Sequence, residues 1–206
     1  FLHFKPPMVS CSMMLINISF ILSAYLIGSL SSAIIICKLW GLPDPRSKGS
    51  NNPGATNVLR IGGRIPAILT LLGDGCKGWV PTLVIANLAV PTWLVGSVML
   101  ATLVGHIWPV FFEFKGGKGV ATAMGAFLGL AWPVGAILIS TWALVIAITR
   151  FSSLGAIIAT LLAPVLGYLW LRDIVLTAAI SVMSILLLVR HKDNIVRLCT
   201  GKEARI

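Results

Sequence analysis

The chain has 206 residues, of which 57% are hydrophobic and 11% are charged, and its mean hydropathy is +0.97. A soluble domain averages roughly 25% charged and 45–50% apolar residues, so this composition excludes an ordinary soluble protein. Sixteen Lys and Arg against six Asp and Glu give a net charge of +10, which favours anionic ligands or lipid headgroups. We therefore expect one integral membrane domain, with membrane lipids as partners and no nucleic acid.

Seven apolar stretches predict an all-α integral membrane protein with about seven transmembrane helices, some of them short. A helix needs about 20 apolar residues to cross a bilayer. Near-continuous apolar runs indicate helices, because the strands of a membrane barrel alternate polar and apolar residues. The fourth and fifth stretches are short, so five spans with a re-entrant pair are the alternative. The predicted stretches are residues 15–40, 65–86, 90–112, 119–132, 134–148, 154–170 and 174–189.

The N-terminal residues 1–12, which lack an initiator Met, are interpreted as a disordered segment or one added artificially. Residues 13–206 then form a single multi-pass domain. In the seven-span topology Lys5 and Arg172 lie near one side of the membrane. Because basic residues concentrate on the cytoplasmic side, the N-terminus is predicted outside and the C-terminus inside. The basic residues on the cytoplasmic side are Lys38, Arg46, Lys48, Arg60, Arg64, Lys115, Lys118, Arg150, Arg190, Lys192, Arg197, Lys202 and Arg205.

The first polar patch is the linker at residues 41–60, which is rich in Gly, Ser, Asn and Pro. Such residues form turns and cap helices, but their hydroxyls and amides also suit a ligand with many oxygen atoms. A helix is expected to begin close by, so its positive dipole end would be available to an anion. The candidate phosphate-binding residues here are Ser50, Asn52, Thr56, Asn57 and Arg60.

The second patch, residues 106–122, contains Phe-Lys-Gly-Gly-Lys-Gly-Val-Ala-Thr at positions 114–122. Glycines let main-chain N–H groups approach phosphate oxygens, and lysines neutralise the charge. The segment is not a Walker A loop, because Gly119 follows Lys118 and no strand precedes it. The alternative is a hairpin whose lysines snorkel. The candidates are His106, Lys115, Gly116, Gly117, Lys118 and Gly119, although an isolated histidine is more often packed than functional.

A buried ion pair is predicted within the second apolar stretch. Asp74 and Lys77 are three residues apart, so one helix face carries both charges. Charges inside a membrane are costly and tend to be paired. We therefore interpret these two residues as a structural ion pair.

Two further patches complete the predicted site. One contains Ser152 and Ser153, and the other begins near His191 in the tail. His191, Asn194 and Arg197 recur at three-residue spacing, so a helix leaving the membrane would carry them on one face. The alternative is a solvated amphipathic end. Because the topology places all the patches on one side, we expect them to form a single site.

These motifs, in this order and spacing, resemble the bacterial acyl-phosphate glycerol-3-phosphate acyltransferases from about residue 20 to the end. Any one motif alone would be weak. The residues that carry the similarity are Gly28, Ser29, Gly49, Ser50, Asn52, residues 54–57, Arg60, Asp74, Lys77, Gly78, Gly105, His106, residues 109–111, residues 114–122, residues 152–154, His191, Asn194, Ile195, Arg197, Leu198, Gly201 and Glu203.

The resemblance implies that an acyl group passes from acyl phosphate to the 1-hydroxyl of sn-glycerol 3-phosphate, giving lysophosphatidate and phosphate in phospholipid biosynthesis. It implies a multi-pass acyltransferase domain at residues 13–206 in the bacterial cytoplasmic (inner) membrane, with the active site facing the cytoplasm. The implied partners are the two substrates, membrane lipids and the enzyme that produces acyl phosphate. We expect no cofactor, and no metal, since the acidic residues are scattered.

Acyl phosphate is already activated, so the enzyme needs mainly to position two anions and stabilise the oxyanion. We expect Lys118 and its glycine-rich loop to hold one phosphate and the first patch to hold the other. Asn194 would donate to the acyl carbonyl. His191 would orient the substrate or act as base, the alternative base being the phosphate of acyl phosphate itself. The catalytic candidates are His191, Asn194 and Lys118.

Two other functions compete with this interpretation. A membrane transporter of an organic phosphate would also use basic residues and broken helices, but it predicts charges near mid-membrane and an inverted repeat. The charges instead cluster on one face and the sequence shows no repeat, which disfavours the transporter. A scaffold that binds anionic lipids would need the charge alone, and neither the glycine-rich loop nor the tail face of His191, Asn194 and Arg197.

Overall fold

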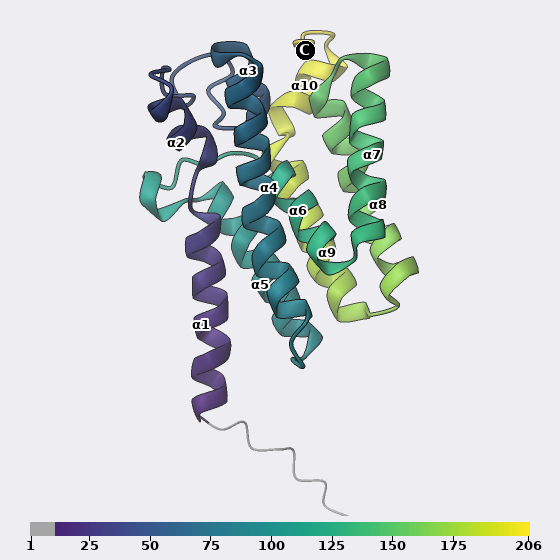
Figure 1. The fold of residues 1–206 in the computed structure, drawn as a ribbon. Helices are drawn as coiled ribbons and strands as arrows, with labels where there is room; N and C mark the ends of the chain where they lie inside the picture. The colour runs from purple at the N-terminus through teal and green to yellow at the C-terminus, as the bar shows by residue number, and fades with distance from the viewer. Residues whose placement is uncertain (1–10) are drawn as a thin grey trace, which may run out of the picture.

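The computed structural model describes residues 11–206, and within this range the chain forms helices and connecting loops without strands (Figure 1). The interpretation of residues 1–10 lies outside the described residues, whereas residues 11 and 12 already belong to the first helix. The predicted apolar stretches correspond to α1 (Cys11–Gly28), α4 (Arg64–Ala86), α5 (Thr92–Ile107), α6 (Val120–Leu130), α7 (Trp132–Thr149), α8 (Ser152–Leu171) and α9 (Ile174–Arg190).

The all-α membrane fold is confirmed, but the number of complete spans differs from the predicted seven. Five helices in the described range are long and apolar enough to cross a membrane, or six if α9 and α10 (Lys192–Cys199), which meet at 58°, count as one span. Helix α6 has 11 residues. At 1.5 Å per residue it extends about 16 Å, roughly half of the ~30 Å hydrocarbon core. It is therefore a half-length helix inside the bundle.

The first predicted stretch is broken rather than continuous. Helix α1 ends at Gly28, and α2 (Ser32–Leu39) follows after a short non-helical segment. Close packing on α5 accompanies this break: a Cβ at Gly28 would collide with the carbonyl of Thr102. The Leu30 carbonyl then accepts a hydrogen bond from Lys77 Nζ at 2.7 Å. The segment between α1 and α2 thus contacts the charged Lys77 on α4.

The two ends of the bundle differ in chemistry. The start of α1 and the turn between α8 and α9, which contains Arg172, lie at one end in Figure 1. The short helices α2, α3 (Ala55–Gly62) and α10 gather with the C-terminus at the other end. Most predicted polar patches belong to these short helices and their loops. The fold therefore brings them to one end of the molecule.

Helix α6 is buried against α4 through small residues. A Cβ at Gly125 would collide with the Gly75 carbonyl, and one at Gly78 would collide with the Thr122 carbonyl. Such backbone-to-backbone approach is a common way to join helices in lipid, where burial of apolar surface gives no driving force. Many large apolar side chains instead point outward, among them Leu72 and Ile148. They form the surface that contacts lipid.

Candidate active site

A cavity of about 720 Å³ lies between α3, α4, α6, α7, α8, α10 and the C-terminal segment 200–206. Helix α6 contributes only its first residues, from Val120 to Met124, to the wall. At this point the cavity is also lined by the first half of α4 and by Trp142 and Ile146 in the second half of α7. The cavity therefore lies at the N-terminal end of the half-length helix, between α4 and α7.

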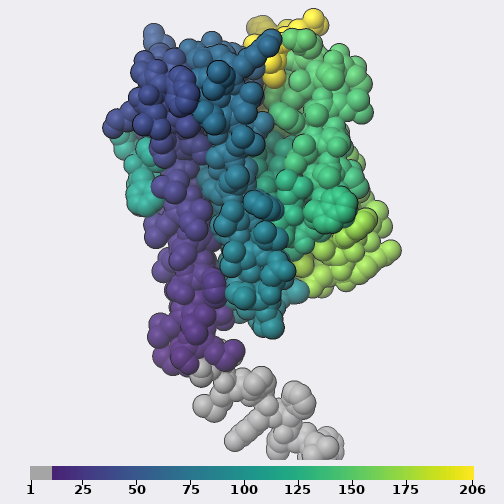
Figure 2. Space-filling model, viewed as in Figure 1, coloured from purple at the N-terminus to yellow at the C-terminus, as the bar shows by residue number. Residues whose placement is uncertain are grey.

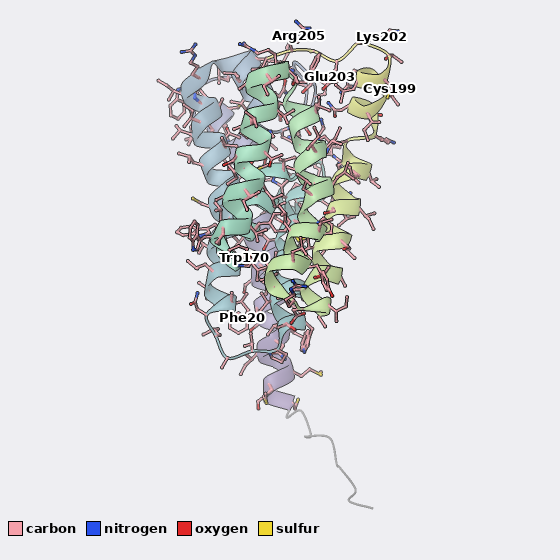
Figure 3. All side chains as sticks on the ribbon, turned by 90° about the vertical axis from the view of Figure 1, so that its right-hand side faces the viewer. Phe20, Trp170, Cys199, Lys202, Glu203 and Arg205 are labelled. Carbon is pink, nitrogen blue, oxygen red and sulfur yellow. The ribbon has the colours of Figure 1, made fainter. Side chains whose placement is uncertain are left out.

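The C-terminal segment 200–206 forms one wall of the cavity. Figure 2 shows this segment, in yellow, between the upper ends of α4 and α7, and Figure 3 shows Lys202, Glu203 and Arg205 at the same end of the bundle. The guanidinium of Arg150 donates two hydrogen bonds to the Ile206 oxygen, at 3.0 and 2.7 Å. These contacts fix the segment to the start of α8.

Thirteen of the sixteen predicted site residues line this cavity. They come from the first linker, from the loop before α6, from the start of α8 and from α10, as expected of a single site. The thirteen are Ser50, Asn52, Thr56, Asn57, Arg60, His106, Lys118, Gly119, Ser152, Ser153, His191, Asn194 and Arg197.

Lys115, a predicted phosphate ligand, does not line the cavity. Its side chain is 69% exposed and forms a surface ion pair with Glu113, with 2.8 Å between Nζ and Oε2. The preceding 3₁₀ turn, Val110–Phe112, lies beside α1 and α2, away from α10 (Figure 1). Glu113 and Phe114 both have positive φ, so the chain turns sharply between this exposed segment and the cavity. Of the two lysines, only Lys118 faces the site.

Gly116 and Gly117 also have a different role from the predicted phosphate cradle. Their N–H groups donate to the main-chain carbonyls of Ile107 and His106, at 3.2 and 3.3 Å. A Cβ at Gly116 would collide with the His106 carbonyl, and one at Gly117 with the imidazole. These glycines allow the loop to pack directly on the end of α5. Their N–H groups are therefore occupied within the protein.

Asn57 lines the cavity, but its amide stabilises the linker instead of offering donors to a ligand. Its Nδ2 donates to the carbonyls of Pro45 and Lys48, both at 2.9 Å. Its Oδ1 accepts from the N–H of Ser50 at 2.8 Å. The side chain is almost fully buried. Asn57 thus fixes the shape of the linker that carries Ser50 to the cavity.

Glu203, which the predicted site residues did not include, lines the cavity and joins three of them. Its Oε1 accepts hydrogen bonds from Ser153 Oγ and Asn194 Nδ2, both at 2.6 Å, and its Oε2 pairs with Arg197 Nε at 2.8 Å. Burial raises the pKa of the Glu203 carboxyl, but these three hydrogen bonds outweigh it and hold the pKa below its ordinary value. The carboxylate therefore stays charged and links α8 to α10.

Lys118 and Asn194 form the centre of the site. Lys118 Nζ donates to Asn194 Oδ1, so the loop before α6 is joined directly to α10. Burial lowers the pKa of Lys118 to about 8; Glu203 opposes this shift, and Arg197, with two further arginines, adds to it. The ammonium is thus poised between its charged and neutral forms near physiological pH.

His191 lies at the junction of α9 and α10 and is buried at the cavity wall. Its Nδ1 is 2.7 Å from the carbonyl oxygen of Leu187. A carbonyl can only accept, so Nδ1 carries the hydrogen in this contact. In the neutral ring, Nε2 is then the acceptor nitrogen. The predicted shared face of His191, Asn194 and Arg197 is confirmed, since all three line the cavity.

The predicted ion pair within α4 is confirmed. Lys77 Nζ is 2.9 Å from Asp74 Oδ1, and both side chains are more than nine-tenths buried. The His106 Nδ1 lies 3.8 Å from the same carboxylate and 3.2 Å from the Thr122 hydroxyl. His106 therefore reaches the cavity as one member of a packed polar network.

The cavity has a polar basic part and an apolar part. Five basic residues and two carboxylates, Asp74 and Glu203, line it, so the site attracts anions. The apolar part is formed by side chains of α4, α6 and α7. The basic residues are Arg60, Arg64, Lys118, Arg197 and Lys202, and the apolar residues include Ile68, Leu71, Met124, Trp142 and Ile146. Among residues 11–206, no group of three His, Cys, Asp or Glu is placed to hold a metal ion.

Comparison with known proteins gives consistent matches. The family model described as glycerol-3-phosphate acyltransferase matches residues 18–201. A glycerol-3-phosphate acyltransferase of Methylococcus capsulatus is 57% identical over 183 residues, which cover 89% of this chain and 92% of the relative. One of Shewanella loihica is 50% identical over 195 residues, 95% of each chain.

Two solved structures share the fold. The crystal structure of PlsY (YgiH), an integral membrane glycerol 3-phosphate acyltransferase, in its glycerol 3-phosphate form has a TM-score of 0.88 at 36% identity. The lysophosphatidic acid form of that protein has a TM-score of 0.85 at 34% identity. Each alignment covers 92% of this chain and 95% of the solved chain.

Proposed function

The chain belongs to the glycerol-3-phosphate acyltransferase family, and we propose that it transfers a fatty acyl group from acyl phosphate to the 1-hydroxyl of sn-glycerol 3-phosphate. The products are lysophosphatidate and inorganic phosphate. The observation that carries the proposal is the composition of one cavity, which joins a basic, donor-rich part to an apolar part. Two phosphates fit the first part, and an acyl chain fits the second.

Charged side chains from separate elements hold the two phosphate groups. Lys118 comes from the loop before α6, Arg60 from α3 and Arg197 from α10, and all three line the cavity. The hydroxyls of Thr56 and Ser152 lie 3.2 Å apart at the same wall and add hydrogen-bonding groups. Fixing two anions in this way brings the hydroxyl and the acyl carbonyl together without the entropic cost of a random encounter.

Asn194 stabilises the charge that develops on the acyl oxygen. Its Oδ1 faces Lys118, and one of its amide hydrogens is donated to Glu203. A side-chain amide has two hydrogens, so the second is available to the acyl carbonyl. Because Lys118 and Glu203 already hold the amide, little reorganisation accompanies the reaction.

The reaction balances without an added base. The 1-hydroxyl oxygen forms a bond to the acyl carbon, the bond from that carbon to the phosphate oxygen breaks, and the hydroxyl proton ends on the released phosphate. His191 accepts a hydrogen bond from the hydroxyl through Nε2 and directs it at the carbonyl. This assignment rests on the Nδ1 contact with Leu187, which leaves Nε2 as the acceptor.

We place the protein in the bacterial cytoplasmic membrane, with the cavity facing the cytoplasm. Basic side chains support this orientation: the cavity end carries five of them in the site alone, whereas Arg172 lies at the other end. Basic residues concentrate on the cytoplasmic side of membrane proteins. A cytoplasmic opening also gives the site access to glycerol 3-phosphate and to the enzyme that supplies acyl phosphate.

The test is phosphate release by the purified protein given palmitoyl phosphate, with and without glycerol 3-phosphate, with Lys118→Ala as the comparison. We expect release that depends on glycerol 3-phosphate, yields lysophosphatidate and is largely lost in the variant. Palmitoyl-CoA in place of palmitoyl phosphate tests the identity of the donor. If the folded wild-type protein formed no lysophosphatidate with either donor, the proposal would be wrong.

A further inference from the structure

A second void lies one helical turn deeper in the bundle than the apolar part of the cavity. Along α7 the cavity wall contains Ile146 and Trp142, and the next turn places Leu138 against a second, separate void. Along α8 the wall ends at Ala156, and one turn further Thr160 lines that void. The same two helices therefore line both spaces in succession.

The second void is apolar and very small, with a volume of about 10 Å³. This is about the space that one water molecule needs, too small for an acyl chain. Apart from the Thr160 side chain, its lining is aliphatic or aromatic. The residues that line it are Val120, Ala123, Met124, Phe127, Leu138, Ala159, Thr160 and Leu187.

Met124 lies at the boundary of the two spaces. It and Val120 are the residues that line both the cavity and the second void. Met124 is 9% exposed and belongs to the apolar core cluster, and it has the longer side chain of the two. A thioether chain is unbranched and flexible, so it fills such a gap without fixing a rigid wall.

We propose that Met124 sets the length of the acyl chain that the enzyme transfers, by closing the inner end of the acyl-binding part of the cavity. This inference rests on the proposed function, because it assigns the occupant of the apolar part to the acyl chain of the substrate. The chain runs inward between α6, α7 and α8 from the carbonyl held at Asn194. Its terminal carbons contact the Met124 side chain.

Trp142 is less suited to this role because its position is fixed. A Cβ at Gly155 would lie 2.8 Å from the Trp142 carbonyl and 3.1 Å from its ring, so α8 packs tightly against it. Met124 has the second void behind it instead. Truncation to alanine would join the void to the cavity and lengthen the acyl-binding part by about one helical turn, or ~5 Å.

The experiment is a competition assay in which an equimolar series of saturated acyl phosphates of increasing length meets a fixed concentration of glycerol 3-phosphate. The lysophosphatidate products are quantified by mass spectrometry. In Met124→Ala we expect the product ratio to shift toward longer chains, by roughly fourfold for each additional methylene that becomes buried. In Met124→Phe, which narrows the path, we expect the opposite shift.

Met99→Ala is the matched control. Met99 is fully buried in α5 and lines neither space, so its truncation loosens packing without changing the acyl-binding part. We expect its product ratios to match those of the wild type. If Met124→Ala unfolds, Met124→Phe and Met124→Leu still test the inference through their ratios.

The outcomes separate the inference from the proposed function. An active wild type whose product ratios are unchanged in all folded Met124 variants would show that the acyl chain leaves the cavity sideways toward lipid, and the inference would be wrong. The same ratio shift in Met99→Ala would also overturn it. A wild type without transfer activity would instead contradict the proposed function.

Discussion

Glu203→Gln tests whether the carboxylate that joins α8 to α10 organises the active site. In the wild type, Oε1 accepts two hydrogen bonds of 2.6 Å and Oε2 pairs with Arg197 at 2.8 Å. Glutamine keeps one oxygen and replaces the other with an NH₂ group. If its oxygen serves Ser153 and Asn194, its NH₂ must face the guanidinium, and donor then meets donor.

The size of this effect follows from the burial of the group. The Glu203 side chain is 8% exposed, and a hydrogen bond to a charged group contributes about 1.5–3 kcal/mol. The Arg197 partner is 42% exposed, so solvent screening reduces its share and the lower end applies. We expect the free energy of unfolding to fall by about 2 kcal/mol, which lowers the melting temperature by on the order of 5 °C. Turnover should fall as well, because the amide of Asn194 loses its fixed orientation.

Glu113→Gln is the matched control. Glu113 forms an ion pair of the same length with Lys115, but both side chains are 69% exposed. Exposed pairs contribute little, so we expect no measurable change in melting temperature or turnover. The assay is tryptophan fluorescence on heating in detergent, paired with phosphate release. Equal effects of the two substitutions would refute the reasoning, because burial would then make no difference.

Three further predictions concern charge and packing. First, Lys118 is charged below its pKa of about 8, so its attraction for phosphate is lost as pH rises through 8. The KM for glycerol 3-phosphate should therefore rise above pH 8. The same rise in Lys118→Arg would contradict this assignment. Second, Asp74→Asn or Lys77→Met alone should lower the free energy of unfolding by about 3–5 kcal/mol, because each leaves a buried charge unpaired. The double variant should recover much of the lost melting temperature. Purely additive losses would argue against the pair. Third, Gly117→Ala should abolish activity, because its Cβ would collide with the neighbouring imidazole. Gly75→Ala should keep activity, because its Cβ would meet only one atom, at 3.9 Å. Equal activity of the two variants would exclude packing as the role of the loop glycine.

Hydropathy predicted the helices well because polar residues, glycines or prolines stand at the ends of most apolar runs in the sequence. The runs at 134–148 and 174–189 agree with α7 and α9 to within two residues. The 119–132 run was less informative. Ala131 has an extended backbone, and Pro133 lies in the first turn of the next helix, so α6 ends early. A run of this length does not by itself distinguish a full span from a half-length helix.

Predictions for the site succeeded where helical periodicity determines which side chains share a face. They failed where the conformation of a loop determines which side chains reach the cavity. The spacing of His191, Asn194 and Arg197 placed all three on the cavity wall. Loop conformation decided between Lys115 and Lys118, and no periodicity reports the positive φ of Glu113. Glu203 lies in the non-helical segment after α10, where periodicity does not apply, so only the tertiary fold reveals its partners.

The short length of α6 has a consequence for how the protein is assembled in the membrane. A helix of 11 residues extends about 16 Å and cannot enter the bilayer as an independent span. Only Ala131 separates it from α7, so the two would enter together as a hairpin. Its glycine contacts are with α4, so they require that helix to be in place. Docking of this hairpin would therefore complete the enzyme, since the inner wall of the cavity does not exist until α6 reaches α4.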